Sequence, residues 1–326
     1  MSSDSSVAVA SLGLFILDRF EWRTQDADGS LTVKKREDAI IGGGGTYAVI
    51  GSRVWLPAAR VGILVDRGYD WPAEVERELE TYGKEMWVYR EKPDAPTTRA
   101  LNLYTGEHRD FEYLTPRVRL EPQDLPAPMR TSQYLHFVCS PTRARVITSL
   151  LSPPLNPTPH RRPQCVYEPI PDRCVPDELE PLRAVLPLID VFSPNHEEAG
   201  AFFGWSTAEV ARGGRGGIEA IAKRFLDAGA KDVVLIRSGP LGAYAVRRGE
   251  ERGVWVPAYH SYEDGRATGK VVDVTGAGNS FLASFVIEQF GLPKMQLGED
   301  GTERWNGVDP ATRLAEMQAR QAEGAR

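Results

Sequence analysis

The chain has 326 residues, of which 41% are hydrophobic and 26% are charged, and this composition is typical of a globular protein with a substantial core. Its 39 Lys and Arg against 45 Asp and Glu give a net charge of −6, which argues against general binding to nucleic acids or membrane surfaces. No apolar run approaches the roughly 18 residues that cross a bilayer. The first residues lack the basic segment of a signal peptide, and the three cysteines lack the spacing of a metal site. We therefore expect a cytoplasmic protein with reduced thiols.

Short apolar runs and helix-like segments alternate along the chain. The expected strands are rich in β-branched and aromatic residues and lie at 7–17, 60–65, 86–89, 134–139, 164–167, 190–192 and 232–236. The expected helices lie at 47–55, 73–82, 142–151, 176–186, 196–203 and 217–228. This alternation predicts an α/β fold, a three-layer arrangement around a doubly wound, mainly parallel sheet, with ligands at the carboxyl ends of the strands.

Residues 19–41 and 90–113 interrupt this alternation with polar sequence. Apolar and polar residues alternate in parts of both stretches, which predicts antiparallel strands that leave the main sheet and form a small β lid. Two long surface loops are the alternative, but loops of this length without structure are uncommon. We expect one domain over 7–293, lid included, and a polar tail over 294–326 that holds a short helix.

Two further stretches are expected to be connectors. Residues 152–187 hold ten of the 24 prolines, which break helices and remove backbone donors, so most of this stretch is expected to be connector, with a short strand at 165–167. The glycine-rich stretch 212–217 predicts a flexible loop before a helix. Arg-Gly-Gly sequences also occur in RNA-binding proteins, but a single short stretch is weak evidence for that function.

The segment 271–282 carries the most specific chemical pattern in the chain. An apolar strand runs into Gly276-Ala277-Gly278 and then into an apolar helix. Glycines let the backbone turn sharply and approach a ligand, and N–H groups at the start of a helix attract anions. The pattern predicts an anion hole for a phosphoryl group in transfer. A tight turn without a ligand is the simpler alternative.

The string from Asp273 to Gly278 resembles the signature of the ribokinase-like PfkB carbohydrate kinases. Four other segments are similar to family motifs and follow the family's order. Residues 11–18 are similar to the family's first strand with its sugar-contacting Asp, and residues 42–48 are similar to its di-glycine motif. Residues 193–198 contain its Asn-x-x-Glu motif, and residues 236–242 are similar to its Gly-x-x-Gly turn near the nucleotide. Each motif alone is short, and the shared order over 7–293 makes the resemblance specific.

The resemblance implies ATP-dependent phosphorylation of a hydroxyl group on a sugar or a similar small molecule, a ribokinase-like fold and a set of site residues. Asn279 takes the position of the catalytic base, beside an anion hole of Gly276, Ala277 and Gly278. The residues expected to bind substrate are Asp18, Gly43, Gly44 and Arg99, and those expected to bind nucleotide are Asn195, Glu198, Ser238, Gly239, Gly242 and Thr275. The resemblance also implies Mg²⁺ held by Glu198 through water, with a monovalent cation near Asp273 as a further option. Relatives often pair through their lids, so a homodimer through the lid is an expectation.

The chain departs from the family at the catalytic base. The family has Asp where this chain has Asn279, and an amide cannot accept a proton near neutral pH. Losing a general base typically lowers the rate by ~10²–10⁴-fold. Two hypotheses stay open, a slow or unusual kinase and a catalytically inactive pseudokinase that binds a ligand or serves as a scaffold. A structural relic without a ligand is a third option.

The chain is also short after this motif. The family has two helices there, and this sequence predicts one, at 280–290, so about one helical hairpin is missing. Skipped coding sequence and a real loss are both open. Together with Asn279 and the glycine run 42–45, residues 305–310 resemble a fungal branch of the family related to the maintenance-of-killer protein. Glu168 stands where the family often has Asp before Pro, and a role near the phosphates and a structural role are both open.

Overall fold

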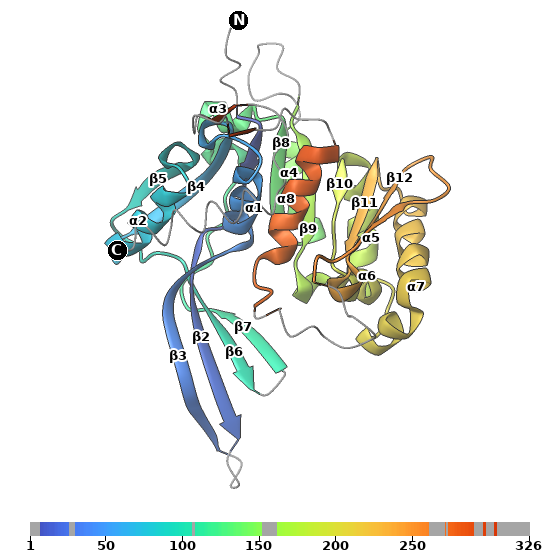
Figure 1. The fold of residues 1–326 in the computed structure, drawn as a ribbon, viewed down its shortest axis with the longest axis horizontal. Helices are drawn as coiled ribbons and strands as arrows, with labels where there is room; N and C mark the ends of the chain where they lie inside the picture. Colours follow the sequence, from blue (N-terminus) through green and yellow to red (C-terminus); the bar gives the residue numbers. More distant parts are fainter. Residues whose placement is uncertain are drawn as a thin grey trace, which may run out of the picture. The chain divides into compact units, whose positions relative to one another are not determined.

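The computed structural model describes residues 7–25, 30–105, 108–151, 162–260, 271, 273–289, 296–297 and 303–304 (Figure 1). These residues fall into two units. Unit 1 consists of 1–120 and 279–326, and unit 2 consists of 121–278. The helix expected in the tail lies outside the described residues, where only the paired strands β14 (Gln296–Leu297) and β15 (Glu303–Arg304) are described after 289. No helix among the described residues is long and apolar enough to cross a membrane.

Unit 1 is built around parallel strands of apolar sequence. Strands β1 (Val9–Ser11), β4 (Val61–Gly68) and β5 (Trp87–Lys92) lie side by side in that order. The first five residues of β4 are buried, as expected for a strand that is covered on both faces. Helices α1 (Gly44–Arg53) and α2 (Ala73–Thr81) connect these strands, and right-handed crossovers place both helices on one face.

The expected strand at 7–17 is two strands, because the chain turns at Gly13. Strand β1 ends at Ser11, and β2 begins at Ile16. The Gly13 N–H donates to the Ser11 side chain at 3.0 Å, which holds the turn. A Cβ atom on Gly13 would lie 2.6 Å from the Cα of Gly45, so this loop passes directly against the start of α1.

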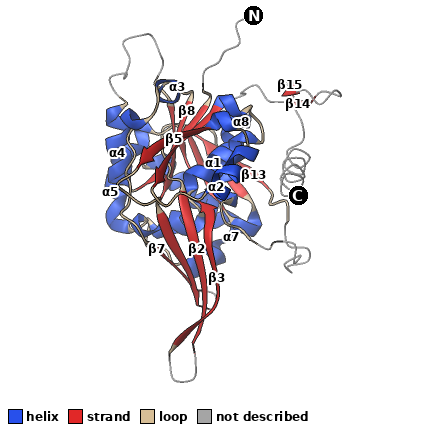
Figure 2. Ribbon diagram, turned by 90° about the vertical axis from the view of Figure 1, so that its left-hand side faces the viewer, coloured by secondary structure: helices blue, strands red, loops and turns tan. Residues whose placement is uncertain are grey.

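The predicted β lid is a separate sheet of unit 1. Its strands are β2 (Ile16–Gln25), β3 (Leu31–Gly42), β6 (Arg99–Thr105) and β7 (His108–Tyr113), in the order β3-β2-β6-β7. Figure 2 shows β2 and β3 as a long antiparallel pair of strands. The rings of Phe20, Trp22 and Tyr104 stack along one face with centroids 5.8–6.2 Å apart. The expectation of antiparallel strands was wrong for β2 and β6, which run parallel because both start at the base of the lid, where Leu17 N–H donates to Thr98 O at 2.9 Å.

Helix α8 (Ala277–Gln289) packs against α1 through small residues in unit 1. The Ser280 hydroxyl donates to the Tyr47 carbonyl at 3.0 Å, and the Ser284 hydroxyl donates to the Gly51 carbonyl at 3.3 Å. A Cβ atom on Gly51 would lie 2.5 Å from the Ser280 Cα. The backbones of the two helices therefore touch, and this contact holds the part of α8 from Ser280 onward against α1 in unit 1.

Replacing Gly51 by Ala is expected to lower the free energy of unfolding by about 1–3 kcal/mol, because the new methyl group meets backbone atoms that cannot move aside. Gly216→Ala is the control, since that helical glycine has open space around it and the substitution should stabilise by about 0.4–1 kcal/mol. Urea unfolding of both variants checks the prediction. Equal effects of the two substitutions would contradict the close packing of α8 on α1.

Unit 2 contains parallel strands in the order β11-β10-β9-β8, extended by β12 and β13, which are antiparallel. The strands are β8 (Tyr134–Cys139), β9 (Gln164–Pro169), β10 (Val191–Phe192), β11 (Val233–Arg237), β12 (Ala243–Arg247) and β13 (Val254–Val256). The helices are α3 (Ala127–Arg130), α4 (Pro141–Leu150), α5 (Leu179–Val185), α6 (His196–Ala201) and α7 (Thr207–Asp227). Successive parallel strands are neighbours here, so right-handed crossovers place α4, α5 and α7 on one face.

Aromatic side chains form the core of unit 2 around β10. Phe192 is fully buried, with its ring centroid 5.0 Å from that of Phe225 and 5.5 Å from that of Tyr167. Phe202 joins the cluster at 6.5 Å from Phe192. Because β10 has only two residues, these ring contacts hold the point at which the chain leaves the strand toward α6.

The glycine-rich stretch 212–217 lies within helix α7, so the prediction of a loop there was wrong. The Ser206 side chain accepts a hydrogen bond from the Glu209 N–H, and Glu209 reaches back to the Ser206 N–H, which starts the helix ten residues earlier than expected. Gly214 has non-helical angles (φ 51°, ψ −147°) and kinks the helix. Short 3-10 helices lie at Ala58–Arg60, Lys84–Met86, Pro122–Asp124, Pro171–Arg173, Pro176–Glu178, Leu186–Leu188 and Gly239–Leu241.

Candidate functional site

The predicted substrate residues of unit 1 meet at the base of the lid. The carboxylate of Asp18 in β2 is buried, and a Cβ atom on Gly42 at the end of β3 would lie 1.9 Å from its Oδ2. Gly43 has a φ of 95° and precedes α1, which begins at Gly44. Only glycine at 42 leaves room for the carboxylate, so the glycine run brings the start of α1 close to Asp18. A buried carboxylate beside the start of a helix can accept hydrogen bonds from hydroxyl groups of a ligand.

Arg99, the other predicted substrate residue, is held by an acidic side chain. Its Nε donates to Oδ2 of Asp70 at 2.9 Å, and Oδ1 of Asp70 accepts a hydrogen bond from Thr97 N–H at 2.7 Å. Burial raises the pKa of Asp70, but these two donors outweigh burial and hold the pKa below its ordinary value. The ion pair ties the start of β6 to the loop after β4, and contact of Arg99 with a substrate stays a prediction.

In unit 2 the carboxyl ends of β9, β10 and β11 meet, because these strands are parallel neighbours. Asn195 and Glu198 begin α6 as a reciprocal pair. Oδ1 of Asn195 accepts from the Glu198 N–H at 2.8 Å, and Oε2 of Glu198 accepts from the Asn195 N–H at 2.7 Å. Asn195 also forms a bridge with Arg237, the last residue of β11. The structure therefore explains this motif locally as a helix cap.

Arg237 joins a buried charge cluster at the same strand ends. Its Nη1 lies 2.8 Å from Oε2 of Glu168, and its Nη2 donates to the Ser193 carbonyl at 3.0 Å and lies 3.7 Å from Oε2 of Glu198. The other oxygen of Glu168, Oε1, lies 2.8 Å from Nε2 of His136. Glu168 and His136 are 2% and 3% exposed. Sequence reasoning missed Arg237 and His136, although an arginine directly after the apolar run 233–236 was a usable signal.

Burial is the largest influence on Glu198 and raises the pKa of its carboxyl from 4.5 to about 7, against the opposing charge of Arg237. In the unfolded chain this carboxyl ionises near its ordinary pKa. Between about pH 4.5 and pH 7 the folded state therefore holds a proton that the unfolded state has lost, and stability falls as the pH rises through this window.

Glu198→Gln should remove this dependence, because glutamine keeps the acceptor of the helix cap and does not titrate. The free energy of unfolding of the unchanged protein, relative to the variant, should fall by up to about 3 kcal/mol between pH 4.5 and pH 7.5. Urea unfolding of both proteins at the two pH values, in buffer with a chelator, measures this difference. Parallel pH curves for the two proteins would contradict the prediction.

The glycine turn before Asn279 is folded by its own backbone. Oδ1 of Asp273 accepts a hydrogen bond from the Thr275 N–H at 2.8 Å, and Gly276 has a φ of 73°. The N–H of Ala277 donates to the Val274 carbonyl at 3.1 Å, so one of the three N–H groups expected in the anion hole is used inside the turn. Gly278 lies in the first turn of α8, where N–H groups have no acceptor within the helix.

Two further features of this turn bear on a ligand. A Cβ atom on Gly278 would lie 2.5 Å from Nη1 of Arg237, so the guanidinium lies directly against this glycine. Asn279, at the position of the family's base, is half-buried in the first turn of α8. The structure thus brings Gly278 and the Arg237 cluster together in unit 2.

The turn after β11 is closed by backbone contacts. The Ser238 N–H donates to the Gly242 carbonyl at 2.7 Å, and the Ser238 hydroxyl donates to the Ile236 carbonyl at 3.2 Å. A Cβ atom on Gly242 would lie 2.0 Å from the Val256 carbonyl oxygen, and Gly239 has a φ of 51°. The glycines at 239 and 242 are therefore required by the turn itself, and their contact with a nucleotide stays a prediction.

The residues of unit 2 fit magnesium that arrives with a phosphate ligand. No group of three or more His, Cys, Asp or Glu side chains suited to a metal occurs among the described residues. Oε2 of Glu198 is used by the helix cap, while Oε1 accepts no hydrogen bond from a described residue. Protein Mg²⁺ sites often use one or two carboxylates, with waters and substrate phosphates completing the shell. Glu198 fits that description, and Asp273 is engaged by Thr275.

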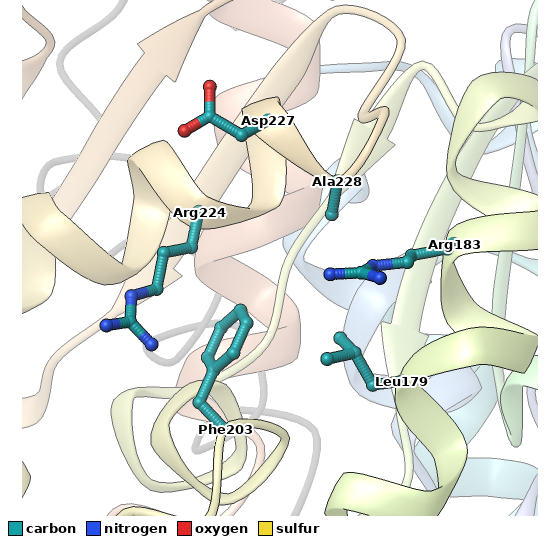
Figure 3. Close-up of a pocket in the computed structure, with 6 residues that line it drawn as sticks. All are labelled: Leu179, Arg183, Phe203, Arg224, Asp227 and Ala228. Carbon is teal, nitrogen blue, oxygen red and sulfur yellow. The ribbon is translucent and has the colours of Figure 1, made fainter.

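A surface pocket of about 570 Å³ in unit 2 holds none of these residues (Figure 3). It is lined by Leu179, Arg183, Phe203, Arg224, Asp227 and Ala228. The Arg224 guanidinium lies over the rings of Phe203 and Trp205 at 5.3 and 5.2 Å, and Arg183 pairs with Glu180 at 2.7 Å. These contacts explain both arginines as surface packing between α5, α6 and α7.

A family comparison bears directly on the strand ends of unit 2. A model of the pfkB family of carbohydrate kinases matches residues 159–288. This part of the chain is similar to that family. It includes the caps of α6, the turn after β11 and the glycine turn before Asn279, so the resemblance read from these motifs is confirmed.

Two curated fungal proteins are similar to almost the whole chain. Protein MAK32 of Saccharomyces cerevisiae is 29% identical over 358 residues, covering 96% of this chain and 92% of the relative. An uncharacterized protein of Schizosaccharomyces pombe is 29% identical over 345 residues, covering 95% and 92%. The predicted fungal branch is therefore confirmed. Both alignments are longer than the 326 residues of this chain, so both relatives contain residues for which this chain has gaps.

Solved structures confirm the predicted ribokinase-like α/β fold. A ribokinase from Giardia lamblia has a TM-score of 0.66 at 19% identity, covering 98% of this chain and 90% of that one. A ribokinase from Cryptococcus neoformans in complex with ADP has a TM-score of 0.63 at 18% identity, covering 88% of both chains. An Escherichia coli structure in complex with ATP and Mg²⁺ has a TM-score of 0.59 at 17% identity, covering 98% and 92%.

Proposed function

We propose that the chain is a carbohydrate kinase-like protein of the cytoplasm that slowly transfers a phosphoryl group from ATP to a hydroxyl group of a sugar or a similar small molecule. The pfkB family match carries this proposal, because residues 159–288 include every residue that the sequence predicted for nucleotide contact. Relatives of the same fold were solved with ADP or with ATP and Mg²⁺, which supports nucleotide use.

Each unit has its own part in this proposal. In unit 1, Asp18 and the backbone at Gly43 and Gly44 bind the hydroxyl groups of the substrate. In unit 2, the backbone at Gly278 and the turn after β11 bind the nucleotide phosphates, and Glu198 holds Mg²⁺ through water. The magnesium ion supplies charge neutralisation for the phosphates when it is bound. A homodimer through the lid belongs to the same proposal, and the exposed apolar side chains of Leu31, Val33 and Phe111 on the lid support it.

The chemistry is a single displacement. The substrate hydroxyl oxygen forms a bond to the γ-phosphorus, the bond to the bridging oxygen of ADP breaks, and the hydroxyl proton passes to water. Asn279 can orient the hydroxyl group by hydrogen bonding, but it cannot take the proton. Positioning and charge stabilisation dominate phosphoryl transfer, so turnover persists at a reduced rate.

A pseudokinase that binds nucleotide or sugar without turnover is the second candidate function. Asn279 favours it directly, since this side chain replaces the family's base. The gaps against both fungal relatives agree with the shortening that the sequence predicts after Asn279, and a shortened nucleotide site would favour the pseudokinase as well.

Incubation of the folded full chain with Mg-ATP and a panel of sugars, polyols and nucleosides separates the candidates. We expect slow phosphate transfer to at least one compound, and loss of that transfer in Asp18→Asn, whose folding is checked by circular dichroism. Binding of ADP without transfer to any compound would favour the pseudokinase. Neither transfer nor nucleotide binding would contradict both candidates.

A further inference from the structure

We propose that Arg237 is the cation that binds a phosphate of the nucleotide at the glycine turn of unit 2, and that Glu168 and the Ser193 carbonyl position its guanidinium for that contact. This inference rests on the nucleotide site proposed above. Arg237 lies within the motif 236–242 but is not among the residues that the sequence predicted to contact the nucleotide.

The first argument is the contact between Arg237 and Gly278. A Cβ atom at 278 would lie 2.5 Å from Nη1 and 3.4 Å from both Cδ and Cζ of Arg237, so the guanidinium plane covers the place where any other residue would have a side chain. Gly278, in the first turn of α8, and a guanidinium therefore lie next to each other in unit 2. Both features attract the same class of ligand, an anion with several oxygens.

The second argument is the number of donors that Arg237 has left. A guanidinium carries five N–H donors in a fixed plane. Nη1 lies at ion-pair distance from Glu168, and Nη2 donates to the Ser193 carbonyl. Nε is buried and has no hydrogen-bond partner among the described residues. A guanidinium held at two points, with donors remaining, matches the paired acceptor oxygens of a phosphate.

The third argument is that other polar atoms at the same strand ends lack partners. Ser193 Oγ, directly after β10, and Nδ1 of His196, in the first turn of α6, are buried without a hydrogen-bond partner among the described residues. The Ser193 carbonyl accepts a hydrogen bond from Arg237, and the backbones of Asn195 and Arg237 form an isolated β-bridge. Buried polar atoms without partners usually indicate bound water, an ion or a ligand. Their position beside Arg237 fits a polar ligand at this corner of unit 2.

His136 has a supporting role in this arrangement. It lies 2.8 Å from Oε1 of Glu168, which leaves Oε2 as the oxygen that faces Arg237. The carboxylate is thereby fixed in one orientation, and the guanidinium is fixed with it. Arg237 is thus a positioned ligand-binding residue, with Glu168 and His136 as positioning residues behind it.

A purely structural ion pair is the competing explanation, and binding measurements distinguish the two. Calorimetric titration of the full chain with ADP and with adenosine, both with Mg²⁺, compares ligands that differ only in the phosphates. The test variants are Arg237→Lys, which keeps the charge but loses the planar fork, and the double variant Arg237→Gln with Glu168→Gln, which removes both buried charges together. The double variant keeps the test valid if the single one fails to fold.

We expect both variants, when folded, to bind ADP at least ~10-fold more weakly than the unchanged protein, with adenosine affinity changed less than about twofold. Unchanged ADP affinity in the folded variants would overturn the role of Arg237 and leave the proposed function standing. If the unchanged protein binds ADP no better than adenosine, the proposed nucleotide site fails together with this inference.

Discussion

Replacing Asn279 by Asp should raise the rate of phosphoryl transfer by about 10²–10⁴-fold, because a carboxylate at this position can take the proton of the attacking hydroxyl group. The change adds no bulk in the first turn of α8, where Asn279 is half-buried. The effect should appear in kcat more than in KM for ATP, because the carboxylate acts on the proton of the attacking hydroxyl group. Steady-state kinetics with the best acceptor from the panel measure both constants.

Asn279→Leu is the matched control, as it has similar size and neither accepts a proton nor donates a hydrogen bond. Its turnover should be at or below that of the unchanged protein. The Asp variant should also show a fall in rate toward acidic pH that the unchanged protein lacks, because protonation disables the new base. If the Asp variant is no faster, the missing base is not what limits this protein, and the segment after Asn279 becomes the better explanation.

Replacing Phe192 by Ala should lower the free energy of unfolding by about 3–5 kcal/mol, because the substitution empties the centre of the aromatic cluster of unit 2. Its ring is fully buried, between those of Tyr167 and Phe225. The loss also reaches the candidate site, since β10 ends one residue before Ser193. Urea unfolding gives the stability change, and titration with ADP gives the effect on binding.

Phe203→Ala serves as the comparison. Its ring is half-buried, 5.0 Å from that of Phe225, at the edge of the same cluster. Solvent already reaches this ring, so the substitution should have a clearly smaller effect and leave ADP binding unchanged. Equal losses for the two variants would contradict a core that is centred on Phe192.

The main architecture was predictable because the buried strands consist mainly of apolar residues, which can be recognised in the sequence. The run 233–236 is apolar throughout and 134–139 is apolar apart from His136, which is typical of strands covered on both faces, and both are strands in the structure. The lid was predictable from the change to alternating polar sequence. Its parallel pair β2–β6 was not, because strand direction depends on where the chain returns to the sheet and has no local signal.

The candidate site was predictable where a motif is both local and chemically specific. Asn195 and Glu198 lie three residues apart, and the structure shows them as one helix cap. Arg237, Glu168 and His136 lie far apart in the sequence, and only the parallel pairing of their strands brings them together. The helix through 212–217 was not predicted because its glycines favour a loop, whereas the cap at Ser206 starts a helix that continues through them with a kink at Gly214.

The comparison with the fungal relatives bears on the length of the segment after Asn279. Helix α8 ends at Gln289, and residues 290–295 lie outside the described residues. The alignment gaps agree with the expected loss of a helical hairpin but do not locate it. Transcript sequence around codons 281–285 would show whether the hairpin is encoded.

A crystal structure of the full chain grown with ADP and Mg²⁺ tests the central claim most directly. We expect the β-phosphate within hydrogen-bond distance of both the Gly278 N–H and the Arg237 guanidinium. A nucleotide bound away from these residues, or no bound nucleotide at saturating concentration, would contradict the account.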